Sequence, residues 1–222
     1  MNKSSLLKFG LAVGILTTTG NVLENQEASA ASTQYQNYNN LDLYSYYTQR
    51  GTSISNLEVY KENNNVLEFL LPGGPVIQAN VTSGFYNSVT EGQGKYDVFV
   101  VNETTNRGTV EINIGGVTKS GKLSNPKSFK INIKNDKNPL EDLNINIDKE
   151  EISLKELDFK IRKMLIEKKG LYKDGVNGGK ITIQHNGDEK NKNTFELHKK
   201  LQEHRMSDVI KTESIKGIEV VL

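Results

Sequence analysis

The sequence has no cysteine and no tryptophan, and it has only three histidines and four prolines in 222 residues. Without cysteine the chain cannot form disulfides, thiolate metal sites or a cysteine nucleophile. It also lacks an excess of either charge, because 28 Lys and Arg residues face 27 Asp and Glu residues. The two signs balance both before and after residue 140, so neither half is the basic lobe that a nucleic-acid-binding domain normally has. The composition therefore predicts no nucleic-acid partner.

The first thirty residues have the pattern of a secretory signal peptide. Lys3 and Lys8 precede a short apolar run, Phe9–Leu16, and Ala28-Ser29-Ala30 is an A-x-A cleavage signal. The apolar run is much shorter than the roughly 20 residues that a membrane-spanning helix needs. We therefore expect residues 1–30 to be removed, and we expect a secreted, extracellular protein with no membrane insertion.

Residues 35–137 have mostly the period of two that is typical of strands. A short helical segment comes first, Leu41–Tyr47, with Leu43, Tyr46 and Tyr47 on one side. Short strands with Gly and Asn turns and hardly any helix then predict a small β-barrel domain. The expected strands are Leu57–Tyr60, Val66–Leu70, Val76–Val81, Tyr96–Val101 at the centre, Glu111–Ile114 and Phe129–Ile133.

The pattern changes near Asn138-Pro139, and we expect a second domain over residues 141–222. Its one convincing helix runs from Leu154 to about Lys168, with Asp158 and Arg162 among the polar residues outside its apolar face. A helix across a sheet predicts an α+β domain. The expected strands are Leu143–Asp148, Lys180–His185, Asn193–Leu197 and Ile218–Leu222.

Both ends of this helix carry recognisable signals. Ser153 is the expected N-cap, and Glu156 three residues later completes a capping box. Gly170 lies where a left-handed C-terminal cap is expected.

Few residues are available for catalysis. The histidines are His185, His198 and His204, and no serine elbow, phosphate loop or metal-ligand spacing accompanies them. His198 and His204 are six residues apart, so joint zinc binding is the alternative to two exposed surface histidines. We expect no enzymatic activity, no cofactor and no metal, and a function of molecular recognition instead.

A set of spaced residues resembles the signature of the staphylococcal and streptococcal toxins at every fixed position. Its pattern is Lys149-x2-Ile152-x4-Leu157-Asp158-x3-Arg162-x2-Leu165-x5-Leu171-Tyr172. The segments 97–101, 115–118 and 205–210 are similar to those of the superantigen-like (exotoxin-like) branch of that superfamily. The resemblance covers essentially the whole mature chain. It implies a two-domain β and α+β fold, with an N-terminal OB-fold β-barrel followed by a C-terminal β-grasp domain with one crossing helix.

Asp158 and Arg162 lie four residues apart within this signature. We interpret them as a modest ion pair of the scaffold, because surface ion pairs rarely carry function.

Two departures separate the sequence from true superantigens. Those proteins carry Tyr-Gly-Gly-x-Thr-x4-Asn before the second domain, whereas this chain has Ile114 before Gly115-Gly116-Val117-Thr118 and Leu123 at the Asn position. The chain also has no cysteine pair for the disulfide loop that is common in enterotoxins. The departures argue against binding to T-cell receptors and class II molecules. They favour the superantigen-like branch, whose members bind host proteins of innate immunity or sialylated glycans.

The segment 194–206 resembles the stretch that forms the sialyl-glycan pocket of glycan-binding superantigen-like proteins. The resemblance implies that Thr194 offers its hydroxyl and backbone to the sialic acid carboxylate and that Glu196 accepts hydrogen bonds from sugar hydroxyls. Lys199 and Arg205 would supply charge-assisted hydrogen bonds. The structural alternative is that the polar residues simply face water while the apolar ones pack in the core, namely Phe195, Leu197, Leu201 and Met206.

The expected partners are sialylated glycans on host leukocyte surface glycoproteins. The alternative is glycan-independent binding to a leukocyte receptor or to a serum immune protein such as an antibody or a complement factor. The polar loops at Gly73–Pro75 and Gly84–Gly94 are the expected place for such a protein contact.

Overall fold

The computed structural model describes residues 39–71, 76–92, 95–101, 110–135, 140–173, 175–186 and 191–222. The predicted signal peptide lies outside these ranges, as does the loop Gly73–Pro75. Residues Asn37–Leu222 cluster as one compact unit. Within the described ranges, no helix has the length and hydropathy needed to cross a membrane.

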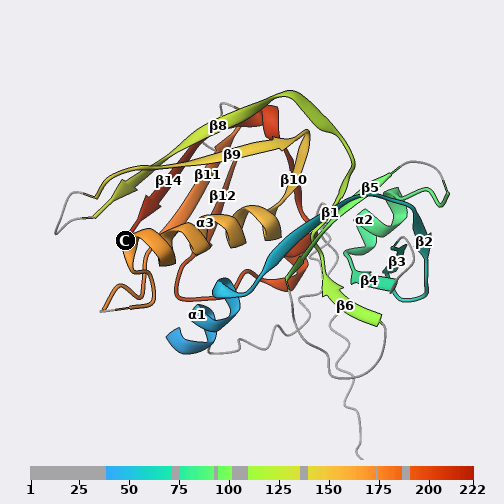
Figure 1. Cartoon of the computed structure of the whole chain (residues 1–222), viewed down its shortest axis with the longest axis horizontal. Coiled ribbons are helices and arrows are strands. Elements are labelled where there is room, and N and C mark those ends of the chain that lie inside the picture. Colours follow the sequence, from blue (N-terminus) through green and yellow to red (C-terminus); the bar gives the residue numbers. More distant parts are fainter. Residues whose placement is uncertain are drawn as a thin grey trace, which may run out of the picture. The chain divides into compact units, whose positions relative to one another are not determined.

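The first half of this unit contains two short helices and two sheets (Figure 1). One sheet has the order β1-β5-β7 and the other has the order β2-β3-β4-β6, with β4 and β6 parallel. The predicted central strand, Tyr96–Val101, is β5 and lies in the middle of its sheet. The elements are α1 (Asn40–Thr48), β1 (Gly51–Leu57), β2 (Val59–Lys61), β3 (Val66–Leu70), β4 (Val76–Asn80), α2 (Ser83–Ser88), β5 (Tyr96–Val101), β6 (Val110–Ile114) and β7 (Val117–Lys119).

The predicted barrel is not confirmed, because no sheet of the described residues closes on itself. β2 begins two residues after β1 ends, yet β1 pairs with β5 and β2 pairs with β3, so the strands divide between two sheets. Part of the expected loop Gly84–Gly94 is also helical. α2 begins there because the side chain of Thr82 accepts a hydrogen bond from the backbone of Phe85 over 3.4 Å.

The second half is a five-stranded sheet in the order β12-β11-β14-β8-β9, with α3 crossing one face (Figure 1). This is the predicted β-grasp arrangement of a sheet with one crossing helix. β14 pairs parallel with β8 and the other pairs are antiparallel. The elements are β8 (Lys122–Lys134), β9 (Leu143–Lys149), β10 (Glu151–Ser153), α3 (Leu154–Lys169), β11 (Lys180–His185), β12 (Lys192–Glu196), η1 (Glu203–Ser207), β13 (Val209–Lys211), η2 (Thr212–Ser214) and β14 (Ile215–Val221).

One strand that we assigned to the first domain lies in the sheet of the second half. The sequence pattern assigns Phe129–Ile133 to the first domain, but these residues belong to β8, which pairs with β9 and β14. β8 has 13 residues, so it is long enough to leave the first half and still run along the second sheet.

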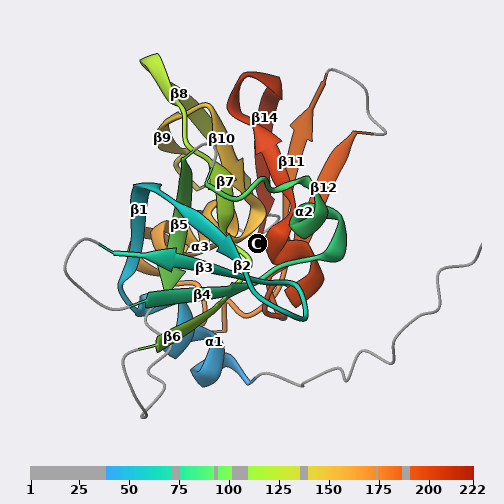
Figure 2. The same cartoon turned by 90° about the vertical axis from the view of Figure 1, so that its right-hand side faces the viewer.

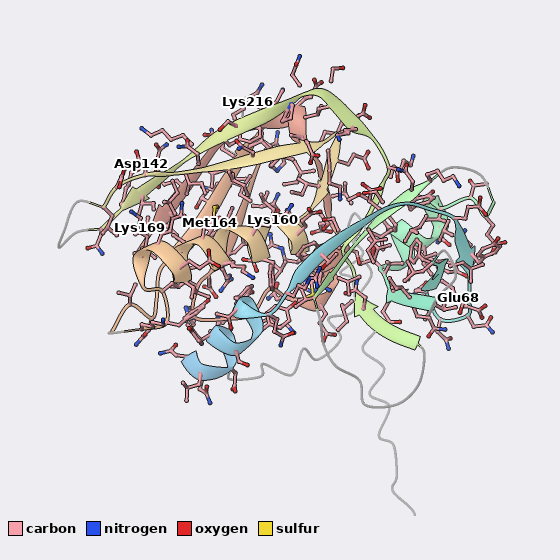
Figure 3. The ribbon with its side chains drawn as sticks, in the orientation of Figure 1. Glu68, Asp142, Lys160, Met164, Lys169 and Lys216 are labelled. Atoms are coloured by element: carbon pink, nitrogen blue, oxygen red, sulfur yellow. The ribbon has the colours of Figure 1, made fainter. Side chains whose placement is uncertain are left out.

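The helix α3 begins and ends as predicted, but its capping box is only half formed. The Ser153 hydroxyl accepts from the backbone N–H of Glu156 over 3.2 Å, and Gly170 has φ 70° at the C-terminal end. The Glu156 carboxylate does not return to the cap. It accepts instead from Lys149 at 2.9 Å and from Lys160 at 2.6 Å, and Figure 3 shows Lys160 on α3. Two ammonium groups bind this buried carboxylate more strongly than one backbone N–H can.

The buried residues form two hydrophobic clusters. The smaller cluster lies among the strands of the first half, and the larger one surrounds α3. The larger cluster also takes in Tyr46 and Tyr47 of α1, and the rings of Tyr47 and Phe159 are 5.7 Å apart. Met164 packs against the same cluster from α3 (Figure 3). The first half of the unit therefore shares a core with the helix that underlies the second sheet.

Candidate functional site

All four predicted site residues line one pocket of about 340 Å³ beside β12. Among the described residues β12 pairs only with β11, and Arg205 in the segment that follows contacts Asn193 and Thr194 of β12. The pocket contains Thr194, Glu196, Lys199 and Arg205, which were predicted. Five further residues, for which the sequence predicts no role in binding, also line the pocket. They are Arg162, Phe195, Lys200, Leu201 and Gln202.

Arg205 is held in place by its neighbours on β12. Its guanidinium donates to the Thr194 carbonyl over 2.9 Å and to Oδ1 of Asn193 over 3.0 Å. The guanidinium carbon also lies 5.1 Å from the centroid of the Phe195 ring. These contacts use two of the five guanidinium N–H donors, so the group is oriented while other donors remain for a ligand.

Glu196 and Lys199 form an exposed ion pair at the rim, with 2.7 Å between their charged atoms. The hydrogen bond from Lys199 lowers the pKa of the Glu196 carboxyl below its ordinary value. The carboxylate therefore stays charged at neutral pH and can accept hydrogen bonds from hydroxyl groups.

Cationic side chains outnumber anionic ones around the pocket. Among the described residues, Lys199, Lys200 and Arg205 line it together with one carboxylate, that of Glu196. The Lys200 ammonium lies 3.8 Å from the centroid of the Tyr46 ring in α1. An anionic group such as a carboxylate matches this charge distribution.

Arg162, one of the lining residues, forms a buried ion pair with Asp158, with 2.7 Å between Nε and Oδ1. The sequence pattern placed these residues on the polar faces of the helix, but both are almost completely buried. The guanidinium also donates to the carbonyls of Glu196 and Leu197, over 3.1 and 2.9 Å. Burial alone would lower the pKa of Arg162, but the Asp158 carboxylate more than offsets this and raises it. The signature pair is thus a charged support under the chain that carries Glu196.

Two buried tyrosines complete this support. The Tyr172 hydroxyl accepts from Arg162 and donates to the Leu197 carbonyl, both over 2.6 Å. The Tyr47 hydroxyl donates to Asp158 over 2.7 Å and accepts from the backbone N–H of Leu201 over 3.4 Å. Burial raises the pKa of both phenols, so both remain neutral donors. Tyr172 closes the signature pattern, whereas nothing in the local sequence around Tyr47 indicates this role.

The Gly115-Gly116 turn between β6 and β7 contacts the residue that follows Arg205. The Gly116 N–H donates to the Met206 carbonyl over 2.9 Å. A Cβ at Gly115 would lie 2.3 Å from the Met206 backbone, and both glycines have positive φ. Only glycine allows this approach, so the motif has a structural task in addition to its resemblance to the toxins.

The alternative of a zinc site concerns His198 and His204. His198 and His204 are exposed, and the Nε2 atom of His185 lies 3.0 Å from the Asn193 amide nitrogen. Within the residues that the structure describes, no group of three His, Asp or Glu side chains is placed to hold a metal ion.

The chain matches known proteins along its length. Residues 128–222 match the family model of the staphylococcal/streptococcal toxin β-grasp domain. Superantigen-like protein 11 of Staphylococcus aureus (strain Newman) is 36% identical over 231 residues, covering 100% of both chains.

Solved structures agree with this match. A Staphylococcus aureus superantigen-like protein in complex with sialyl-Lewis X has a TM-score of 0.72 and 33% identity, covering 83% of this chain and 98% of that one. A second structure from that organism, in complex with 3-N-acetylneuraminyl-N-acetyllactosamine, has a TM-score of 0.73 and 32% identity with the same coverage. With full-length identity above 30% and the toxin β-grasp domain in place, this chain belongs to the staphylococcal superantigen-like protein family.

Proposed function

We propose that the protein is a secreted bacterial immune-evasion factor that binds sialylated glycans on leukocyte glycoproteins through the pocket beside β12. The observation that carries the proposal is the convergence of Thr194, Glu196, Lys199 and Arg205 on that pocket. Two related structures hold sialylated glycans, which supports the same ligand class here. On this proposal the protein acts by occupying host glycans and performs no catalysis.

The roles of the residues follow from their geometry. Arg205 is oriented by Thr194 and Asn193, so its remaining donors bind the sialic acid carboxylate with little loss of side-chain entropy. Lys199 adds a second charge at the exposed rim, and Glu196 accepts from sugar hydroxyls. Because the pocket is shallow and polar, single sites bind weakly and clustered glycans on a cell surface supply the avidity.

Binding to immobilised sialyl-Lewis X, before and after sialidase treatment, tests this proposal. Arg205→Gln removes a charged donor, and we expect the dissociation constant to rise about tenfold to a hundredfold. Arg50→Gln, at an exposed arginine that does not line the pocket, is the matched control and should bind as the wild type does.

Thermal unfolding of both variants separates lost binding from lost folding. Equal binding before and after sialidase treatment would refute the proposal and would favour a glycan-independent protein partner.

A further inference from the structure

A second pocket, of about 330 Å³, lies on the outer face of the five-stranded sheet. Buried Ile181, Ile183 and Ile218 point toward α3, so the residues that alternate with them point to the opposite face. Some of these alternating residues line the second pocket together with Ile218 and with one residue each from β8 and β12. Its lining is Asn132, Thr182, Gln184, Lys192, Gly217, Ile218 and Glu219.

A row of paired residues connects this pocket with the first one. Asn132 pairs with Glu219, Glu219 pairs with Thr182, and Thr182 pairs with Thr194. The row crosses β8, β14, β11 and β12. At the usual strand spacing its two ends lie about 14 Å apart. Figure 2 shows β14, β11 and β12 side by side. Thr194 lines the first pocket, so the polar row leads directly out of it.

The two pockets differ in charge. The first is lined by an excess of cationic groups, whereas the described residues of the second include one ammonium, that of Lys192, and one carboxylate, that of Glu219. Lys134 is ion-paired with Glu219. The remaining side-chain donors and acceptors of the second pocket are two amides and a hydroxyl, from Asn132, Gln184 and Thr182. These groups suit the hydroxyls of uncharged sugars, not a second acidic group.

Gly217 lines the second pocket and has no side chain that could fill it. A Cβ at this position would meet nothing within 4 Å, and the backbone does not have a positive φ. Glycine is usually unfavourable inside a strand, and Gly217 adjoins the register shift between Gln184 and His185. Gly217 pairs with Gln184 across the strands. The missing side chain leaves open space between Gln184 and the row of paired residues.

We infer that the second pocket is a further carbohydrate subsite, which takes the uncharged sugars on the reducing side of a sialylated glycan bound in the first pocket. This inference rests on the proposed function. The terminal sialic acid lies at the cationic pocket, and the following sugars cross β12 at Thr194 and reach the row on β11 and β14. The protein consequently selects long glycans over short ones.

Two ligands and two glycine variants of the full chain test the inference. The short ligand is 3-N-acetylneuraminyl-N-acetyllactosamine, and the long ligand carries a second N-acetyllactosamine at its reducing end. We expect the wild type to bind the long ligand about tenfold more tightly, which corresponds to two or three additional neutral hydrogen bonds.

Gly217→Val fills the second pocket without straining the backbone, and we expect it to abolish this preference while leaving binding of the short ligand unchanged. Gly178→Val is the matched control, because a Cβ there also meets nothing within 4 Å and Gly178 does not line the second pocket. It should retain the preference. Asn132→Ala, which removes an amide from the exposed end of the row, should reduce the preference only in part.

The outcomes distinguish the two proposals. If the wild type binds both ligands equally, or if Gly217→Val keeps the preference, the subsite is refuted while the proposed function stands. If the wild type binds neither ligand, the proposed function itself fails. A lower unfolding temperature for Gly217→Val together with weaker binding of the short ligand would also count against the subsite.

Discussion

The hydroxyl of Tyr47 in α1 donates a 2.7 Å hydrogen bond to the carboxylate of Asp158 in α3, across 111 positions of sequence. The same carboxylate binds Arg162, whose guanidinium holds the two carbonyls at the end of β12. A residue near the start of the described chain therefore supports the pocket near its end.

Tyr47→Phe should lower the free energy of unfolding by about 1–3 kcal/mol, because it leaves an oxygen of buried Asp158 without this donor. Urea unfolding measures the loss. Tyr60→Phe is the control, because the side chain of Tyr60 is exposed, and it should change stability little. Equal stability of the two variants would contradict the role of Tyr47.

The buried ion pair should behave as a coupled unit. Arg162→Met and Asp158→Leu each leave one buried charge without its partner, and we expect each to cost about 3–5 kcal/mol. The double variant should cost clearly less than the two losses together, because it leaves neither charge. The free energies of unfolding of the wild type, the two single variants and the double variant complete a double-mutant cycle. Strict additivity of the losses would show that the pair is not coupled.

Gly115→Ala should displace the segment that carries Arg205, because the new methyl group would collide with the Met206 backbone. Gly92→Ala is the matched control. It has a similar positive φ of 61° with nothing within 4 Å, so it reports the backbone strain alone, about 1–2 kcal/mol.

We expect Gly115→Ala to be less stable than this control and to lose more affinity for sialylated glycan, measured by calorimetric unfolding and by glycan binding. Identical losses in the two variants would exclude a specific role for the contact with Met206.

Stability should fall in acid through Glu156. Burial alone would raise the pKa of this carboxyl, but Lys149 and Lys160 more than offset it and hold the pKa below its ordinary value. The unfolded state therefore takes up the proton first. The stabilisation is complete above the ordinary glutamate pKa, about 4.3, and is lost as the pH falls through the lower folded value.

The stability difference between the wild type and Glu156→Gln should consequently shrink on acidification from pH 6 toward about pH 3. Chemical unfolding at several pH values measures it. Glu167→Gln, at an exposed position of the same helix, should show no comparable trend. A difference that stays constant over this range would contradict the assignment.

The sequence predicted the elements whose signals are local. Ser153 and Gly170 marked the ends of α3, and the strongly apolar run Tyr96–Val101 marked a central strand. The half-formed capping box and the buried Asp158–Arg162 pair could not be predicted this way. Lys149 lies seven positions before Glu156 and Tyr47 lies 111 positions before Asp158, and only the folded chain brings them beside the helix.

The residues of the candidate site likewise divide into those that a local pattern predicts and those that only the fold brings together. Thr194, Glu196, Lys199 and Arg205 were proposed from one segment, and the fold does bring them to one pocket. The supports under that pocket come from α1, α3 and the Gly115-Gly116 turn, which no local pattern connects with it. The second pocket was also missed, because Asn132 and Thr182 become neighbours of Glu219 only through strand pairing.

The position of β14 has a consequence for how the protein folds. It is the last strand along the chain, yet it lies between β11 and β8 and pairs parallel with the latter. The second pocket, which Gly217, Ile218 and Glu219 of β14 help to line, cannot exist until Ile215–Val221 has been made and inserted. Such non-local pairing slows folding. The second pocket is therefore completed only when this last strand has joined the sheet.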